Sequence, residues 1–334
     1  MIRIGFILLI ASFGFAQQSK EELFNESIRF CKLDDHKNVI LNLDKYIVLD
    51  STNFDIYYRR GYSKLMIKEY ESSIVDFNKA LFLNQNHQGS LYNKAVALKE
   101  INKRDEAVDC LNKLIELNPN EFNVYLRRGE IFFDKELFDK ALSDFLIADK
   151  LNPNYNHTVN LLALTHYFKK NYKEALIGFN KVVEKDELFY KVYENRANVY
   201  CALGEYLKAI KDYDKAIELN PSGDVYNNRA YSKYLANDLN GALKDYENAI
   251  LLNPKNEKYF HDRGMIYNKL GKLNEALEDY TKAISINPKL KEAYINRAVV
   301  KYKLKDLDGA CKDAKMAKEL GFDTSKFYSF VSCK

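Results

Sequence analysis

Proline occurs at one fixed phase of a 34-residue period along this chain. All five prolines of the 334 residues close an Asn-Pro pair, at Pro119, Pro153, Pro221, Pro254 and Pro288. The intervals between them are 34, 68, 33 and 34 residues. Because proline cannot continue an α-helix and restricts the residue before it, each pair predicts the end of one helix and the approach to the next. A period of this length indicates a stack of repeated units rather than ordinary globular domains.

Large and small residues recur in fixed columns of this period. With proline at position 32, nine units cover 20–53, 54–87, 88–121, 122–155, 156–189, 190–222, 223–256, 257–290 and 291–324. Position 4 is aromatic in six units, position 8 is Gly or Ala in eight, position 20 is Ala in seven, and position 24 is Phe or Tyr in six. These helical spacings predict two amphipathic helices in each unit, with a turn near position 15 that uses Gly204, Asn237 and Gly271. Small residues let the helix axes approach, and we expect the aromatic residues to fill gaps between neighbouring hairpins.

The columns resemble the tetratricopeptide repeat, whose pattern is a large residue, Gly or Ala, then Ala, an aromatic residue, Ala and Pro. The resemblance implies an all-α fold, a right-handed α-solenoid of helix-turn-helix repeats over residues 20–324. Residues 325–334 are expected to form a short capping helix with Phe327, Phe330 and Val331 on one face. Units 1 and 5 depart most from the pattern, with Val159, Val182 and no proline in unit 5.

The first residues have the pattern of a secretory signal peptide. Arg3 precedes an apolar run from Ile4 to Phe15, and Ala16 follows it. This run is shorter than the roughly 20 residues that a membrane-spanning helix needs, so we expect cleavage after Ala16, with residues 1–16 removed. The pattern predicts an exported protein, periplasmic or secreted, with no transmembrane segment after cleavage.

The composition argues against catalysis and nucleic-acid binding. The 51 basic and 47 acidic residues are interleaved along the chain, which is typical of a solvated helical surface. No nucleophile, zinc or phosphate-binding motif occurs, and His157 and His166 are nine residues apart, on opposite faces of one helix. We therefore expect no enzyme activity, no cofactor, and a protein or peptide partner.

Arginine at position 7 and aspartate at position 23 occur together. The exceptions agree, since unit 5 has Leu162 and Gly178 instead. Pairing with position 23 of the preceding unit fails for three arginines, where that position is Asn, Cys or Gly. We therefore predict structural ion pairs within each unit, and an anion-binding row of arginines is the alternative. The pairs are Arg60 and Asp76, Arg128 and Asp144, Arg196 and Asp212, Arg229 and Asp245, Arg263 and Asp279, and Arg297 and Asp313.

Five cysteines occur, none in a C-x-x-C pair. In an oxidising compartment Cys311, at position 21 of the last unit, is placed to meet Cys333 of the capping segment. A disulfide and two buried thiols both remain possible.

The resemblance implies binding in a concave groove formed by the first helix of each unit, where positions 2, 5, 9, 12 and 13 point inward. Some members of the family hold a chaperone's C-terminal carboxylate there. Asn198, Asn228 and Lys258 resemble part of that clamp, but Glu194 and Asp262 stand where basic residues are required, so we exclude this ligand.

An apolar strip is the predicted binding site. It comprises Leu164, Tyr167 and Phe168 of unit 5 beside Leu126 and Phe133 of unit 4. Secondary aromatic positions are Tyr58, Tyr62, Tyr231 and Tyr234. Such a strip favours an extended or helical peptide, and the alternative is that it packs inside the array. A second functional class stays open, a structural component of envelope assembly that docks folded subunits on its outer or edge surface.

Overall fold

The computed structural model describes residues 18–153 and 155–333, so the predicted signal peptide lies outside the described residues. Those residues form α-helices and turns, with no strand among them. They fall into two compact units, called unit 1 and unit 2 below, that divide between Pro153 and position 154, and each is described by itself. The nine stretches numbered in the sequence analysis are called repeats 1 to 9 from here on. No described helix combines the length and the apolar character that crossing a membrane requires.

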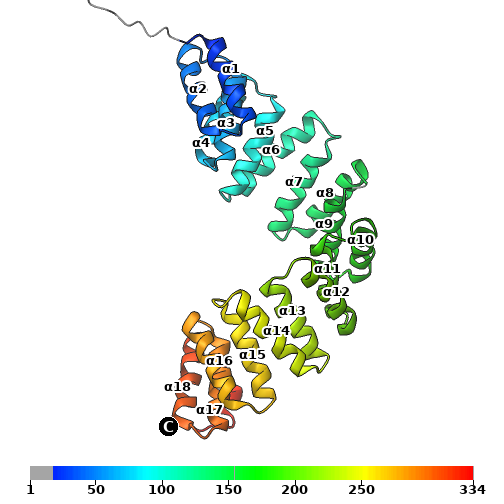
Figure 1. Cartoon of the computed structure of the whole chain (residues 1–334), viewed down its shortest axis with the longest axis vertical. Coiled ribbons are helices and arrows are strands. Elements are labelled where there is room, and N and C mark those ends of the chain that lie inside the picture. Colours follow the sequence, from blue (N-terminus) through cyan, green and yellow to red (C-terminus); the bar gives the residue numbers. More distant parts are fainter. Residues whose placement is uncertain (1–17, 154, 334) are drawn as a thin grey trace, which may run out of the picture. The chain divides into compact units, whose positions relative to one another are not determined.

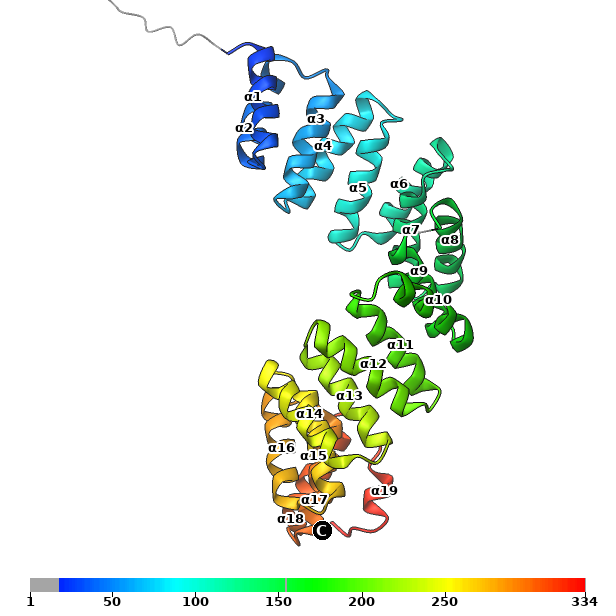
Figure 2. The same ribbon diagram turned by 45° about the vertical axis from the view of Figure 1, so that its right-hand side comes forward.

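Unit 1 contains four helix pairs (Figure 1), and unit 2 contains five pairs and a short terminal helix (Figure 2). In unit 1 the helices are α1 (Lys20–Lys32), α2 (His36–Leu49), α3 (Phe54–Met66), α4 (Tyr70–Leu83), α5 (Gln88–Glu100), α6 (Arg104–Leu117), α7 (Phe122–Asp134) and α8 (Phe138–Leu151). In unit 2 they are α9 (Asn156–Phe168), α10 (Tyr172–Lys185), α11 (Tyr190–Ala202), α12 (Tyr206–Leu219), α13 (Gly223–Leu235), α14 (Leu239–Leu252), α15 (Glu257–Lys269), α16 (Leu273–Ile286), α17 (Lys291–Lys303), α18 (Leu307–Glu319) and α19 (Ser325–Tyr328).

Each pair packs together, and within a unit the second helix of a pair packs against the first helix of the next. This is the helix arrangement of a tetratricopeptide-repeat solenoid. The prolines act as predicted, because α6, α8, α12, α14 and α16 each end one residue before an Asn-Pro pair. The asparagine there has extended backbone, as at Asn118 with φ −147° and ψ 92°.

The turn inside every pair has a left-handed residue at position 15. Glycine supplies it at Gly204 and Gly271, with φ of 76° at both. The seven others, with φ between 58° and 68°, are Asp34, Lys68, Asn102, Glu136, Lys170, Asn237 and Lys305. The four lysine or glutamate turns would be hard to find from composition alone, because these residues rarely adopt positive φ.

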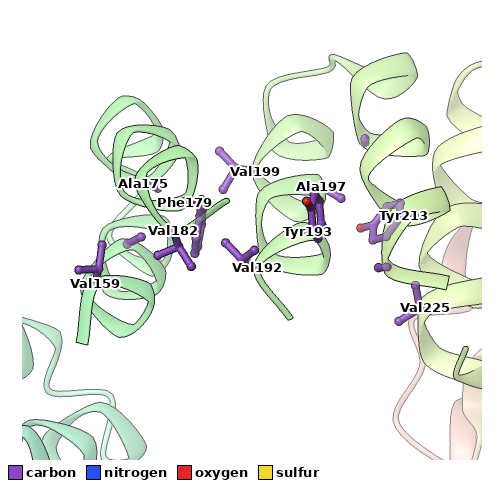
Figure 3. Close-up of a cluster of buried hydrophobic side chains, with 13 residues drawn as sticks. Val159, Ala175, Phe179, Val182, Val192, Tyr193, Ala197, Val199, Tyr213 and Val225 are labelled. Atoms are coloured by element: carbon purple, nitrogen blue, oxygen red, sulfur yellow. The ribbon is translucent and has the colours of Figure 1, made fainter. Parts of the chain in front are cut away.

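The alanine columns and the aromatic residues of position 24 form the interior. In unit 2 one cluster runs from Val159 of α9 to Val225 of α13 and includes Phe179 and Tyr213 (Figure 3). The position 24 rings contact their own pair and also the first helix of the next one, as predicted: Phe77 clusters with Leu65 of α3 and with Ala97 of α5, and Tyr280 clusters with Val300 of α17. A Cβ on Gly129 would lie 2.6 Å from the Phe145 ring, so the small residue at position 8 makes room for the ring of the same repeat.

The end of unit 2 is closed by α19 and the residues after it (Figure 2). Phe327 and Val331 are buried against α17 and α18. The predicted cap helix is too long, because α19 ends at Tyr328, and Phe330 beyond it is 51% exposed. Cys311 of α18 and Cys333 form a disulfide that ties the segment to the last repeat.

Candidate functional site

The position 7 arginines make a repeated structural contact, which removes them from the list of ligand-binding groups. In all six repeats the Nε and Nη2 atoms donate to the two carboxylate oxygens of the same-repeat aspartate, as in Arg263 to Asp279 at 2.8 Å for both bonds. The other five pairs have the same geometry. This bidentate geometry is the strong form of the ion pair.

The same arginines also join neighbouring repeats, a contact that the sequence analysis missed. In five repeats Nη1 donates to position 25 of the preceding repeat, which is Asp44, Asn112, Asn180, Asp214 or Thr281. The guanidinium carbon also lies 5.4–5.9 Å from the centre of the position 4 ring in all six repeats. Each arginine is therefore occupied on one edge and one face, and five of the six are also occupied at Nη1.

A hydrogen-bond ladder joins the first helices of successive repeats. Position 6 of one repeat bonds position 5 of the preceding one. Asn93 Nδ2 donates to the Tyr58 hydroxyl at 3.5 Å, and Arg127 Nε donates to the Tyr92 hydroxyl at 3.2 Å. In unit 2 the same offset joins Asn195 to Asn160 and Asn296 to His261. The ladder holds these side chains in fixed positions on the helix face that the resemblance identifies as the groove.

Two pockets open on this face of unit 1, in the same register. The first has a volume of ≈ 200 Å³ and lies between α1 and α3, lined by Ile28, Cys31, Tyr58, Arg59 and Tyr62 among others. The second, of ≈ 230 Å³, lies between α5 and α7. Its lining includes Tyr92, Val96, Lys99, Arg127 and Ile131. Both use positions 8, 9 and 12 of the first helix and positions 6 and 10 of the next, so each lining contains apolar side chains and one arginine. The second pocket is also lined by Lys99 and Glu100.

Arg59 and Arg127 are held in place at these rims. Arg59 Nε donates to Asp55 at 2.6 Å, one turn earlier on α3, and its guanidinium lies over the Phe24 ring. Arg127 Nη1 donates to Glu130 at 3.0 Å. Both arginines are about half exposed and can reach a bound chain. Burial raises the pKa of Tyr58, which keeps its hydroxyl protonated.

The residues of the predicted main strip differ in exposure: one is buried, three are half-buried and one is exposed. Leu126 is only 4% exposed. Leu164 and Tyr167 are half-buried and pack against the core cluster of unit 2, where α9 and α10 approach closely at Gly178. Phe168 is 49% exposed, and its ring lies 5.3 Å from that of Tyr167. Leu126 and Phe133 belong to unit 1 and the others to unit 2.

The four secondary aromatic residues lie in two different environments. Tyr58 and Tyr62 line the first pocket of unit 1. In unit 2 Tyr231 is 47% exposed beside Tyr234, whose ring lies 4.4 Å from Lys269 Nζ. The residues that the sequence analysis missed are Cys31, Arg59, Tyr92 and Arg127. Arg59 and Arg127 both occupy position 6, in repeats 2 and 4, and this shared position was the signal that the sequence offered for them.

The first-helix face of unit 2 is rich in hydrogen-bond acceptors. Burial and the nearby charge of Asp224 raise the pKa of Glu194. Asp262 is 9% exposed and lies 2.8 Å from His261 Nδ1. Asn227 is 5% exposed, and its Oδ1 has no hydrogen-bond partner among the described residues. Glu194 and Asp262 place acidic groups where a carboxylate clamp needs cations. Across residues 18–153 and 155–333, no group of three or more His, Cys, Asp or Glu side chains is arranged to hold a metal ion.

Comparison with protein-family models matches three stretches of the chain to the tetratricopeptide repeat, at residues 89–121, 190–222 and 258–290. These stretches lie within repeats 3, 6 and 8, which cover 88–121, 190–222 and 257–290. The chain therefore contains tetratricopeptide repeats, as the columns of alanine and aromatic residues indicated.

The chain is also similar in sequence to known proteins. Human tetratricopeptide repeat protein 16 is 25% identical over 217 residues, covering 58% of this chain and 25% of that protein. A STIP1 homolog from Dictyostelium discoideum is 30% identical over 173 residues, covering 48% and 28%. The chain thus spans about a quarter of the length of these relatives.

Solved structures support the fold. A tetratricopeptide repeat protein from Parabacteroides merdae superposes with a TM-score of 0.60 at 20% identity, over 70% of this chain and 93% of that one. The C-terminal part of a repeat-containing protein from Cytophaga hutchinsonii gives 0.58 at 19% identity, over 71% and 97%.

Proposed function

We propose that this chain is a non-enzymatic scaffold that binds a peptide or protein segment on the first-helix face of unit 1. The pair of equivalent pockets carries this proposal. The second pocket lies two repeats after the first, so one extended or helical segment can place successive apolar side chains in both pockets. Tyrosine and arginine are the residues that most often dominate the binding energy of such contacts.

The rim arginines define the preferred ligand more closely. Each already has one carboxylate partner, on Asp55 or Glu130, so neither requires an anionic ligand to be satisfied. The best ligand is an apolar or aromatic side chain whose adjoining backbone carbonyls accept from the exposed guanidinium edges. Proteins of this repeat class act as protein-interaction scaffolds, which agrees with such a ligand.

Filling the first pocket tests the proposal. The probe is a set of peptides selected on the purified chain from a displayed random 12-residue library. Cys31 is exposed at the pocket wall, so Cys31→Phe places a ring in the pocket without removing a buried group. We expect the dissociation constant to rise at least about tenfold.

Cys31→Ser is the matched control, because it changes the thiol and leaves the pocket open. Circular dichroism checks that both variants keep their helices. Selected peptides that bind Cys31→Phe as tightly as the unchanged chain would place the site elsewhere, with Phe168→Ser as the next variant to measure.

We also propose that the protein is exported to the periplasm or beyond the cell. The signal-peptide pattern of residues 1–16 motivates this proposal, and the disulfide between Cys311 and Cys333 supports an oxidising compartment. Sequencing the N-terminus of the native protein tests it. We expect the chain to begin at Gln17, whereas an intact Met1 on protein from the cytosol would contradict export.

A further inference from the structure

An apolar stripe lies on the exposed side of two helices in unit 1. It consists of positions 22 and 29 of α2 and α4, and we call it the outer stripe. Its residues and their exposed fractions are Leu41 (51%), Val48 (85%), Val75 (66%) and Phe82 (77%). Seven residues are close to two helical turns, so the two residues of each helix lie on one face. They belong to neither pocket of the first-helix face.

The other pairs of unit 1 show that the fold does not need apolar residues there. In α6 the same positions hold Asp109 and Glu116, and in α8 they hold Ser143 and Lys150. The interior of α2 and α4 is filled by other residues, including the fully buried Leu43 and Phe77. Four exposed apolar residues on two equivalent helices therefore point to an interaction surface.

We propose that the outer stripe binds a second copy of this chain. The occupant is indicated by opposite charges at one position. Position 18 lies one turn before position 22 on the same face, and it is Lys37 in α2 and Glu71 in α4, both exposed. A two-fold axis parallel to these helices sets α2 of one copy against α4 of the other, in the same direction. Lys37 then faces Glu71 of the second copy, and the contact occurs twice.

The shapes of the two helices fit this register. Phe82 is the largest residue of the stripe and projects from α4. The matching hole lies beside position 29 of α2, where Val48 and Leu49 line a pocket of ≈ 220 Å³ together with Leu23, Lys45 and Gln18. In the parallel arrangement Phe82 of the second copy lies opposite Val48 and enters this pocket. Lys79 already lies over the Phe82 ring in its own chain at 5.0 Å, so the Lys45 stem lines the pocket while its ammonium group turns to solvent.

Charge reversal tests the register directly. The full chain and its variants are measured by sedimentation equilibrium over a range of concentrations. The unchanged chain is expected to dimerise. Lys37→Glu and Glu71→Lys each create two like-charge contacts, so each should raise the dimer dissociation constant by roughly three- to tenfold.

The two single variants provide their own rescue. When Lys37→Glu protein is mixed with Glu71→Lys protein, both contacts across a mixed dimer are attractive again. We therefore expect the mixed dimer to form with about the affinity of the unchanged chain, and the double variant to self-associate equally well. Recovery of dimerisation in both the mixture and the double variant is expected only if Lys37 of one copy faces Glu71 of another copy of the same chain.

Phe82→Glu tests the knob and its hole, and it should raise the dissociation constant at least about tenfold because a charge would enter an apolar pocket. The matched control is Ile177→Glu, at position 22 of α10 in unit 2, which is also exposed at 62% and should change nothing. A chain that stays monomeric at every soluble concentration would overturn the proposal. So would a dimer that Phe82→Glu leaves unchanged, or one that Ile177→Glu weakens equally. These outcomes do not depend on peptide binding at Cys31.

Discussion

The arginine of position 7 accounts for much of the order at the residue scale. Arg229 donates to Asp245 within its own pair and to Asp214 of the preceding pair, and its guanidinium lies over Tyr226. One side chain therefore fixes the angle between two helices and the contact to the next repeat. The two aspartates differ in burial, which separates their energetic roles.

Replacing the aspartate of position 23 should destabilise the fold far more than replacing that of position 25. The Asp76 side chain is 2% exposed and holds both Arg60 and Lys64, whereas that of Asp44 is 51% exposed. Asp76→Ala leaves two cations without their buried partner and should cost about 3 kcal/mol. Asp44→Ala should cost less than about 1 kcal/mol. Urea unfolding followed by circular dichroism measures both, and equal losses would show that the buried carboxylate has no special role.

The turn is the informative feature at the element scale. All nine pairs adopt a left-handed residue at position 15, although only two use glycine. The helices on either side are held by the alanine and aromatic columns, and their packing imposes this backbone even on lysine and glutamate. The strain is real but local, so it can be changed without altering the interior.

Two opposite substitutions test this interpretation. Glu136→Gly should stabilise the chain by about 1 kcal/mol, because glycine adopts positive φ without a steric penalty. Gly271→Ala should destabilise by a similar amount, about 1 kcal/mol, since a Cβ there meets no atom within 4 Å and only the backbone angle is affected. Thermal unfolding midpoints give the two signs. A loss of stability in Glu136→Gly would mean that the Glu136 side chain contributes more than its strain costs.

The closed end of unit 2 matters at the scale of the whole molecule. A repeat array needs a terminal element that covers its last apolar face, and here Phe327 and Val331 do so. The disulfide closes a loop of 22 residues around this contact. Its loss leaves the covering segment held by packing alone.

Breaking the disulfide should therefore weaken the end of unit 2 first. Cys333→Ser should lower stability by roughly 3 kcal/mol, the usual effect of a loop of this size. Hydrogen exchange should show faster opening in α17 and α18 than in α11 and α12. Cys201→Ser is the control, since Cys201 has no disulfide partner. Uniform acceleration across unit 2 would contradict a local role.

The sequence by itself determined the helices, the turns, the alanine and aromatic columns and the same-repeat aspartate partners of the six arginines. These features repeat, and they depend on contacts within one helix pair, so periodic spacing reveals them. The prolines and the residues of position 15 mark helix ends through backbone restrictions that act over one or two residues.

Only the tertiary structure decided which apolar faces stay exposed. Leu126, Leu164 and Tyr167 look like a groove in sequence, yet neighbouring helices cover them to different extents. Tyr58 and Tyr62 look secondary, yet they line a pocket because small side chains at Ser27 and Cys31 leave space opposite them. Exposure depends on the sum of volumes contributed by residues about 30 positions apart, and a pattern read along one helix does not contain that sum.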